Sequence, residues 1–234
     1  MIKQRPSSQP SLSNFLSYLA MHVRQDSQRL PTLTELSQEM GVSTASVREQ
    51  LEVARALKLV EVKPRTGIKP LPYNFSDAIH ISLKYAIEVD PELFQDFSDL
   101  RKKIEAAYWY EVAAQVTGED IHYLNQLVAS AMEKLHSRPP QIPQWEHREL
   151  HTTLYKRLEN PFVLGLLEAY WDLYEQVGLN SFVDLPYLES VWQYHQSIVK
   201  SLEKGDLAGG YKMLTEHMNL LYQRPHTGSR QKFE

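Results

Sequence analysis

The sequence predicts a mainly α-helical protein in two parts, an N-terminal winged helix-turn-helix with a small two-stranded wing and a C-terminal antiparallel bundle made only of helices. Three observations support this fold class. Two short amphipathic segments flank the turn Gly41-Val42-Ser43. Two strand-like segments follow at 59–63 and 68–71. From residue 78 onward, helical segments alternate with prolines and glycines.

The first two helices are predicted from apolar spacing and from one capping signal. Apolar residues recur every three or four positions from Leu12 to about Val23, as in an amphipathic helix. Thr32-Leu33-Thr34-Glu35 then has the capping-box pattern that begins a helix, and Gly41 ends it. We therefore predict one longer helix followed by a shorter one.

The third helix follows after a very short connection. Ser43 can cap it, and Val47, Leu51 and Ala54 recur at helical spacing, whereas Arg48 falls on another face. Two helices joined by so short a turn containing glycine are typical of a helix-turn-helix, in which the second helix enters the major groove of DNA. The alternative is a helical pair that serves only to pack.

A two-stranded wing is predicted next. Residues 59–63 alternate between apolar and polar side chains, Pro64-Arg65-Thr66-Gly67 is typical of a turn, and 68–71 can return as the second strand. The residues that follow are too rich in proline for a helix. We therefore predict a DNA-binding domain at 1–72 and a linker at 73–77.

The chain from residue 78 to residue 222 is predicted to be an all-α domain, followed by a flexible tail at 223–234. Prolines and glycines separate its segments. The predicted helices lie near 78–88, 92–116, 119–136, 143–158, 161–178, 184–204 and 206–222. Such a bundle places its ligand sites in the core between the helices.

Charge and composition distinguish the two parts. Residues 1–72 carry ten Lys and Arg against six Asp and Glu, a local charge of +4, and the remainder carries −8. A basic N-terminal unit is the charge expected of a domain that meets phosphates. The hydrophobic fraction of 42% is sufficient for a packed core.

The sequence contains no cysteine, which excludes disulfides, catalytic thiols and thiolate metal sites. A metal ion would therefore be held by imidazole and carboxylate groups. No apolar run approaches the roughly 18 residues that span a bilayer, and the N-terminal residues lack a hydrophobic signal core. We expect a cytoplasmic protein without a membrane partner.

Four histidines have the spacing of a metal site. His147 and His151 lie one helical turn apart, so their side chains are neighbours on one face. His195 lies ten residues before Gly205, and His217 lies twelve after it. If the chain reverses there, both rings lie roughly 15–18 Å from the turn, at about 1.5 Å per residue, and face each other across two antiparallel helices.

Taken in order, these motifs resemble the GntR family of bacterial transcription regulators and, within it, the FadR-like subfamily. The resemblance covers most of the chain. In the N-terminal part it rests on Leu30-Pro31, on Gly41 to Leu51, which is similar to the family pattern G-V-S-x-x-x-V-R-E-x-L, and on Arg65 and Gly67 of the wing. In the C-terminal part it rests on Asp99-x-Arg101-x-x-x-Glu105, on His151 followed by Asn160-Pro161, on His195-x-x-Ile198, and on Gly205-Asp206 with His217.

Several positions depart from the family pattern. Thr34 and Thr44 stand where many relatives have arginines that approach DNA, and Tyr194 stands where relatives usually have glutamate. His147 occupies a position at which metal-binding members usually have aspartate. This exchange keeps a ligand one turn before His151 but removes a negative charge, which favours zinc, nickel or copper.

The spacing and the resemblance together define the candidate site residues. The candidate DNA contacts are Thr34, Ser43, Thr44, Ser46, Arg48, Arg65, Gly67 and Lys69. The candidate ligands of a divalent transition metal, zinc or nickel, are His147, His151, His195 and His217, with Glu146 as an alternative to His147. Arg101 is the candidate effector contact, because an inward arginine beside a metal can clamp a carboxylate. Alternatively, Arg101 is a surface partner of Asp99 or Glu105.

We predict a homodimeric transcription regulator at the bacterial nucleoid that binds a palindromic double-stranded operator and is controlled by a small carboxylate metabolite. The resemblance implies repression that the effector relieves. One alternative is a metalloenzyme; against it, Arg148 follows His147 directly, where zinc peptidases place a glutamate as general base. The other is a DNA-binding regulator without a ligand response.

Overall fold

The structure is mainly helical and divides into two compact units, Met1–Ser82 and Leu83–Glu234. It is a computed structural model that describes residues 13–25, 29–64, 67–176 and 185–220. Its described strands form one antiparallel two-stranded sheet, and the predicted fold class is confirmed. None of its described helices is long and apolar enough to cross a membrane. The expected tail at 223–234 lies outside the described residues.

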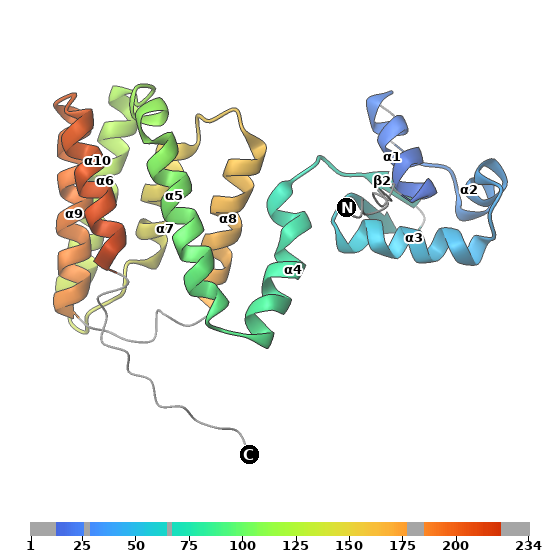
Figure 1. Cartoon of the computed structure of the whole chain (residues 1–234), viewed down its shortest axis with the longest axis horizontal. Coiled ribbons are helices and arrows are strands. Elements are labelled where there is room, and N and C mark those ends of the chain that lie inside the picture. The colour runs from blue at the N-terminus through green and yellow to red at the C-terminus, as the bar shows by residue number, and fades with distance from the viewer. Residues whose placement is uncertain (1–12, 26–28, 65–66, 177–184, 221–234) are drawn as a thin grey trace, which may run out of the picture. The chain divides into compact units, whose positions relative to one another are not determined.

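The first unit has the order of elements expected of a winged helix-turn-helix (Figure 1). Its elements are α1 (Asn14–Arg24), α2 (Leu33–Met40), α3 (Thr44–Ala56), β1 (Val60–Lys63) and β2 (Gly67–Pro70). Each helix begins where a side-chain hydroxyl accepts a hydrogen bond from the backbone N–H three residues later, at Ser13, Thr32 and Ser43. Thr32 and Glu35 form the predicted capping box, and Gly41 ends α2 in the left-handed conformation, at φ +65°.

The core of the first unit lies between its three helices and its sheet. It contains Phe15, Leu19, Leu30, Leu36, Val47, Leu51, Ala54, Val60 and Ile68. In the sheet, Val60 pairs with Pro70 and Val62 with Ile68. Leu30 donates its backbone N–H to the carbonyl of Ile68 at 2.9 Å, so the connection between α1 and α2 is held against the wing.

Helix α4 (Phe75–Val89) begins earlier than the sequence predicted, and residues 75–77 of the expected linker are helical. Proline restricts the residue before it but not those after it, so the chain is free to become helical beyond Pro72. The side chain of Asn74 accepts from the N–H of Ser76 at 2.8 Å at this start. Ser76 of α4 is buried and Asp77 pairs with Nζ of Lys58 at 2.5 Å, whereas most other side chains of this helix are partly or fully exposed.

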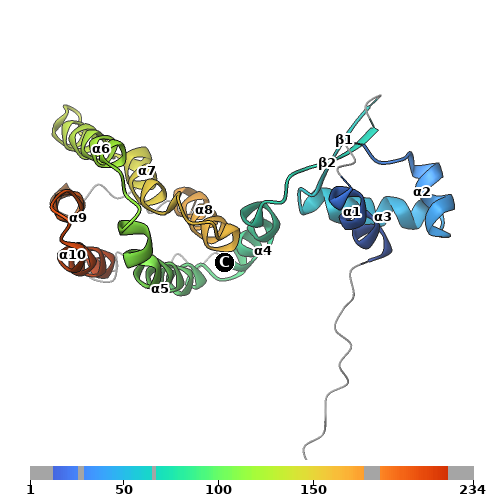
Figure 2. The same ribbon diagram turned by 90° about the horizontal axis from the view of Figure 1, so that it is seen from above.

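The second unit is a bundle whose helices are neighbours in a closed order, α5, α10, α9, α6, α7 and α8, as Figure 2 shows from above. These helices are α5 (Leu93–Ala113), α6 (Gly118–His136), α7 (Gln144–Tyr155), α8 (Pro161–Gln176), α9 (Leu185–Glu203) and α10 (Leu207–Asn219). The buried side chains include Trp109, Leu124, Leu150, Tyr155, Trp192, Ile198 and Leu214. They fill the space that the helices surround.

The hairpin between α9 and α10 positions half of the histidine set. Gly205 has φ +70°, a conformation that a residue with a Cβ rarely adopts, and Asp206 then caps α10 by accepting from the N–H of Gly209 at 2.9 Å. The chain therefore reverses at Gly205-Asp206 as predicted. Gly210 lets α10 approach α5, because a Cβ there would lie 2.5 Å from Cζ2 of Trp109.

Candidate metal centre and nucleic-acid interface

Helix α3 turns its apolar side toward the core and its polar side toward solvent. Val47, Leu51 and Ala54 are buried, whereas Thr44 and Arg48 are exposed. This is the division that a recognition helix requires, because base edges are read by the side chains that do not pack. Arg48 is therefore available to a DNA groove.

The other candidate DNA contacts differ in how free their polar groups are. The hydroxyl of Ser43 caps α3 by accepting from the N–H of Ser46 at 3.2 Å. The hydroxyl of Ser46 accepts from Nε2 of Gln50, also at 3.2 Å, so both serines already have local roles. Thr34 on α2 and Lys69 on β2 are exposed. Arg65 lies outside the described residues.

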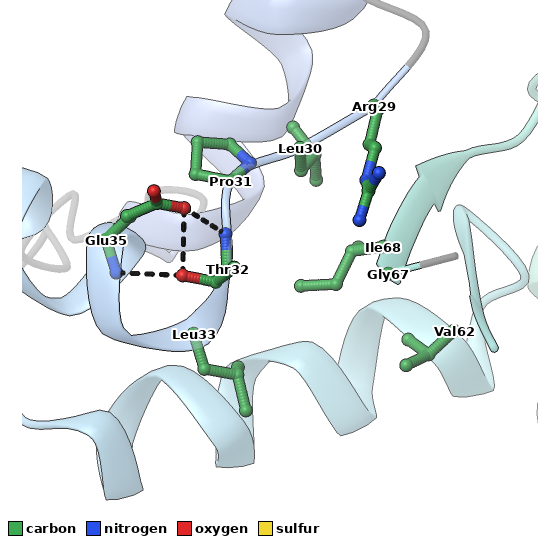
Figure 3. Close-up of a pocket in the computed structure, with 9 residues that line it drawn as sticks. All are labelled: Arg29, Leu30, Pro31, Thr32, Leu33, Glu35, Val62, Gly67 and Ile68. Carbon is green, nitrogen blue, oxygen red and sulfur yellow. Dashed lines mark hydrogen bonds between the residues drawn. The ribbon is translucent and has the colours of Figure 1, made fainter. Parts of the chain in front are cut away.

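Sequence reasoning missed Arg29, which lies against the wing. Figure 3 shows its guanidinium over Gly67, at the edge of a pocket that Thr32 and Glu35 also line. A Cβ on Gly67, whose φ is +79°, would lie 3.0 Å from both Nε and NH2 of Arg29. Hydrogen bonds from Thr32 and the charge of Arg29 lower the pKa of Glu35. The one available signal was the position of Arg29 directly before Leu30-Pro31.

The four histidines converge in the core of the second unit. His147 and His151 come from α7, His195 from α9 and His217 from α10, and one ligand atom from each lies within 4.8 Å of the others. Nε2 of His195 lies 3.2 Å from Nε2 of His151 and 3.1 Å from Nε2 of His217. His151, His195 and His217 are buried, and His147 is partly exposed.

Burial favours the neutral form of the three buried imidazoles, those of His151, His195 and His217. It lowers the pKa of His195 and of His217 well below the usual value, and the neighbouring histidines and Arg101 lower both further. Burial also lowers the pKa of His151, against the opposing effect of Glu105. Neutral imidazole is the form that binds metal.

The distances from Nε2 of His195 to the other two Nε2 atoms match those between ligands of one ion. Two nitrogens about 2.1 Å from a metal lie about 3.0 Å apart at a right angle and about 3.4 Å apart in a tetrahedron. The distances of 3.1 and 3.2 Å lie within this range. An all-imidazole donor set suits zinc, nickel and copper, so the residues present fit a transition-metal ion.

Arg101, the expected effector contact, is buried and already has a partner. Its Nε donates to Oε1 of Glu105 at 2.6 Å, and its guanidinium lies 4.6 Å from the ring centre of Tyr170 and 4.7 Å from that of Trp171. Its NH2 lies 3.0 Å from Nδ1 of His151, which places it beside the histidine cluster. Arg101 therefore does pair with Glu105, but the pair is buried and not at the surface, and Asp99 pairs with Lys103 instead.

Glu146, the alternative ligand to His147, is engaged on another side. Its Oε1 accepts from the hydroxyl of Ser130 at 2.8 Å and pairs with Nζ of Lys134 at 2.7 Å, both on α6. The cluster of ligand atoms contains His147 and not Glu146. The structure thus favours the imidazole at this position.

Comparison with known proteins identifies the family. The family model for the FCD domain matches residues 96–220, more than half of the chain, and this segment contains all four histidines and Arg101. The chain belongs to the GntR family of transcription regulators, in its FadR-like, FCD-containing subfamily. Members of this family are transcription regulators and not enzymes, so the metalloenzyme alternative is not supported.

Two curated regulators are similar to this GntR-family chain over most of its length. The Uxu operon regulator of Haemophilus influenzae is 26% identical over 81% of this chain and 71% of its own. The Uxu operon transcriptional regulator of Escherichia coli is 24% identical over 84% of this chain and 78% of its own. Among solved structures, Streptococcus agalactiae GntR matches with a TM-score of 0.66 at 17% identity, over 90% of this chain and 97% of that one, which supports the fold.

Glu105 is the second residue of this GntR-family protein whose position at the site sequence reasoning missed. It is fully buried, and its Oε2 lies 3.0 Å from Nδ1 of His151. Burial alone would raise the pKa of Glu105, but Arg101 and His151 lower it to about 2. The available signal was the spacing of Arg101 and Glu105 by one helical turn, which by itself also describes an ordinary surface ion pair.

Proposed function

We propose that this regulator binds a palindromic DNA operator as a homodimer, and that a small organic acid bound at a metal ion in the second unit controls this binding. The observation that carries the proposal is the convergence of three buried Nε2 atoms at 3.1 and 3.2 Å in a chain that also contains a helix-turn-helix. A site of this kind in a regulator serves ligand sensing, since the family carries no catalytic function.

The proposed ion is zinc or nickel, held by His147, His151, His195 and His217. When bound, the ion would supply a Lewis-acidic site for a carboxylate oxygen. Four neutral imidazoles leave the charge of a divalent ion uncompensated, and the charge of Arg101 is balanced by Glu105. The centre would therefore carry a net positive charge that favours an anionic effector.

Arg101 stays in this proposal as the effector contact nearest the ion. It is the single buried cationic side chain other than histidine among the described residues. A guanidinium has five donor hydrogens, and Glu105 does not use all of them. An effector carboxylate that reached the ion beside His151 would lie within reach of the remaining donors.

The proposed DNA surface combines α3 with the wing. Arg48 would read a base edge, and guanine is the base that arginine contacts best. Lys69 and Arg29 would contact phosphates, which orient the protein without reading sequence. Gly67, Ser43, Thr44, Ser46, Thr34 and Arg65 complete the proposed surface. Such a protein would act at the bacterial nucleoid.

The homodimer is supported by the surface of α4. Ile81, Tyr85 and Val89 recur every four residues along α4, and all three are exposed. An apolar stripe of this kind indicates a protein interface. A two-fold dimer would present two copies of α3 to the two halves of a palindrome.

Control by an effector requires that the acid bind more tightly in one of two states of the dimer, only one of which binds the operator. The family resemblance favours repression that the effector relieves. In this arrangement the acid stabilises the state with low operator affinity.

The test is a thermal-shift screen of small carboxylic acids on the full-length protein, with and without a chelator. The proposal predicts stabilisation by at least one acid and loss of this stabilisation when the metal is removed. In parallel, the protein should select a palindromic sequence from a random pool of duplex DNA. No response to any acid, with operator binding intact, would support a regulator without ligand control. No selected sequence would contradict the proposal itself.

A further inference from the structure

The buried histidines of the centre differ in what their second ring nitrogen contacts. Nδ1 of His151 lies 3.0 Å from Oε2 of Glu105. In the part of the chain that the structure describes, Nδ1 of His195 and Nδ1 of His217 are buried without a hydrogen-bond partner. Hydrogen bonding from the bundle therefore orients the ring of His151 but not the rings of the other two.

Two groups of opposite character face Nδ1 of His151. Oε2 of Glu105 can only accept a hydrogen bond when the carboxylate is ionised, and NH2 of Arg101, also at 3.0 Å, can only donate one. A neutral imidazole carries a single ring proton. If the proton is on Nδ1, His151 donates to Glu105 and Nε2 is bare. If it is on Nε2, Nδ1 accepts from Arg101 and Nε2 cannot bind an ion.

We propose that Glu105 is a positioning residue of the metal centre, which holds His151 in the tautomer with its proton on Nδ1 and a bare Nε2. Arg101 holds the carboxylate of Glu105 in position through its Nε and NH2. This inference rests on the proposed metal-binding function and names the group that prepares the site for its ion. Carboxylate partners of this kind orient metal-ligating histidines and raise their basicity.

The contacts around the pair favour this tautomer. Arg101 is bound to Glu105 through Nε at 2.6 Å and NH2 at 3.4 Å, so its charge is committed to a carboxylate, a much stronger acceptor than neutral imidazole. The guanidinium also lies against the rings of Tyr170 and Trp171, which hold it in place beside Glu105. The hydroxyl of Tyr155 donates to the backbone carbonyl of Glu105 at 2.8 Å and holds α5 at this position.

Of the three buried histidines, His151 is then the one whose tautomer is already suited to binding an ion through Nε2. Nε2 of His195 lies 3.2 Å from Nε2 of His151 and 3.1 Å from Nε2 of His217. When no ion is bound, two bare nitrogens repel each other at these distances, so a hydrogen lies between them. With Nε2 of His151 bare, at least one of the other two carries its proton on Nε2. That residue must change tautomer when an ion binds, whereas His151 need not.

The direct test is ¹⁵N NMR of the histidine rings in the metal-free, full-length protein. The shifts should show His151 with a protonated Nδ1 and an unprotonated Nε2. In Glu105→Gln, Arg101 should take the amide oxygen and turn the amide NH2 toward Nδ1, so the proton should move to Nε2. His151 protonated on Nε2 in the unaltered protein would overturn the proposal, and this outcome does not depend on whether the variant folds.

The second readout is affinity for Zn²⁺ by competition with a chromogenic chelator. Glu105→Gln should bind Zn²⁺ about 10- to 100-fold more weakly. Glu149→Gln is the matched control, because Glu149 lies on α7 and accepts from the hydroxyl of Tyr123 at 3.2 Å, and its affinity should be unchanged. Equal affinity for both variants would overturn the proposal. If the unaltered protein bound no metal, the proposed function would fail, and the ring shifts would still decide the tautomer.

Discussion

Nε2 of His195 lies 3.1 Å from Nε2 of His217, although the residues are 22 positions apart and lie on different helices. The hairpin produces this distance, because Gly205 reverses the chain and Asp206 starts α10. The two imidazoles therefore lie side by side in the core, and Nε2 of His151, from α7, lies 3.2 Å from Nε2 of His195.

Removing either residue of this pair should abolish metal binding. His195→Ala or His217→Ala deletes one of the three closely spaced Nε2 atoms, so we expect purified protein without bound zinc or nickel in elemental analysis. His122→Ala is the control, since His122 is exposed on α6 and contacts Gln126 instead. Unchanged metal content in both pair variants would contradict the assignment.

The helices and turns were predictable because their signals are local. The capping box at Thr32, the left-handed glycine at position 41 and the hairpin at Gly205 depend on residues within one turn of each other. The prediction of a non-helical linker was wrong at residues 75–77. It extended the effect of proline to residues beyond Pro72, which proline does not restrict. Phe75 therefore begins a helix where the sequence predicted none.

The convergence of the histidines was predictable, but their surroundings were not. Helical spacing pairs His147 with His151, one hairpin pairs His195 with His217, and the family resemblance implied that the two pairs form one site. The role of Glu105 depends on α5 packing against α7 and α8, which brings His151 and Trp171 around the pair it forms with Arg101. In the sequence alone, Arg101 and Glu105 have the spacing of a surface ion pair.

Gly210 should tolerate no side chain. A Cβ would lie 2.5 Å from Cζ2 of Trp109, which is fully buried and donates Nε1–H to the carbonyl of Leu207 at 2.8 Å. Gly210→Ala should lower the free energy of unfolding by about 1–3 kcal/mol, measured in urea. Gly118→Ala, at a helix position with nothing within 4 Å, should be neutral or stabilising by up to about 1 kcal/mol. Equal effects of the two changes would contradict the close approach of α10 and α5.

Asp120 should make stability depend on pH in the acid range. Its burial raises its pKa, but hydrogen bonds with Lys156, Thr117 and Arg157 outweigh this and lower the pKa below the usual value. The stabilisation is thus present above about pH 4, the pKa in the unfolded chain, and is lost as the pH falls toward the folded-state value. Asp120→Asn should cost about 2 kcal/mol at pH 7 and less at pH 3.5.

The measurement for Asp120 is urea unfolding of both proteins at the two pH values. Asp99→Asn is the control, because Asp99 pairs with Lys103 at the surface, and it should cost less than about 1 kcal/mol at either pH. A cost for Asp120→Asn that stays the same at pH 3.5 would show that the charge of the carboxylate does not contribute.

The exposed side of α4 should hold the dimer together. Tyr85 is 72% exposed and Ile81 is 52% exposed on the same helix face. Tyr85→Asp would place a charge in the proposed interface, so we expect a monomer in sedimentation equilibrium where the unaltered protein is a dimer. Met21→Asp, at an exposed position of α1, should leave the dimer intact. A Tyr85→Asp protein that stayed dimeric would place the interface elsewhere.

Arg48 should contribute to DNA binding in a way that salt reveals. A base contact loses affinity for the selected operator alone, by about 1–3 kcal/mol, whereas a phosphate contact lowers affinity for every sequence and reduces the salt slope by about 1. We expect Arg48→Ala to weaken operator binding and to relax sequence preference at one position of each half-site, in fluorescence anisotropy across several salt concentrations.

Lys69→Ala should instead weaken binding to operator and random duplex alike. Lys103→Ala removes the same charge from the surface of α5 and should change neither the affinity for DNA nor its salt dependence. If Arg48→Ala behaved like Lys103→Ala, α3 would not be the recognition helix, and the exposure of Arg48 would need another explanation.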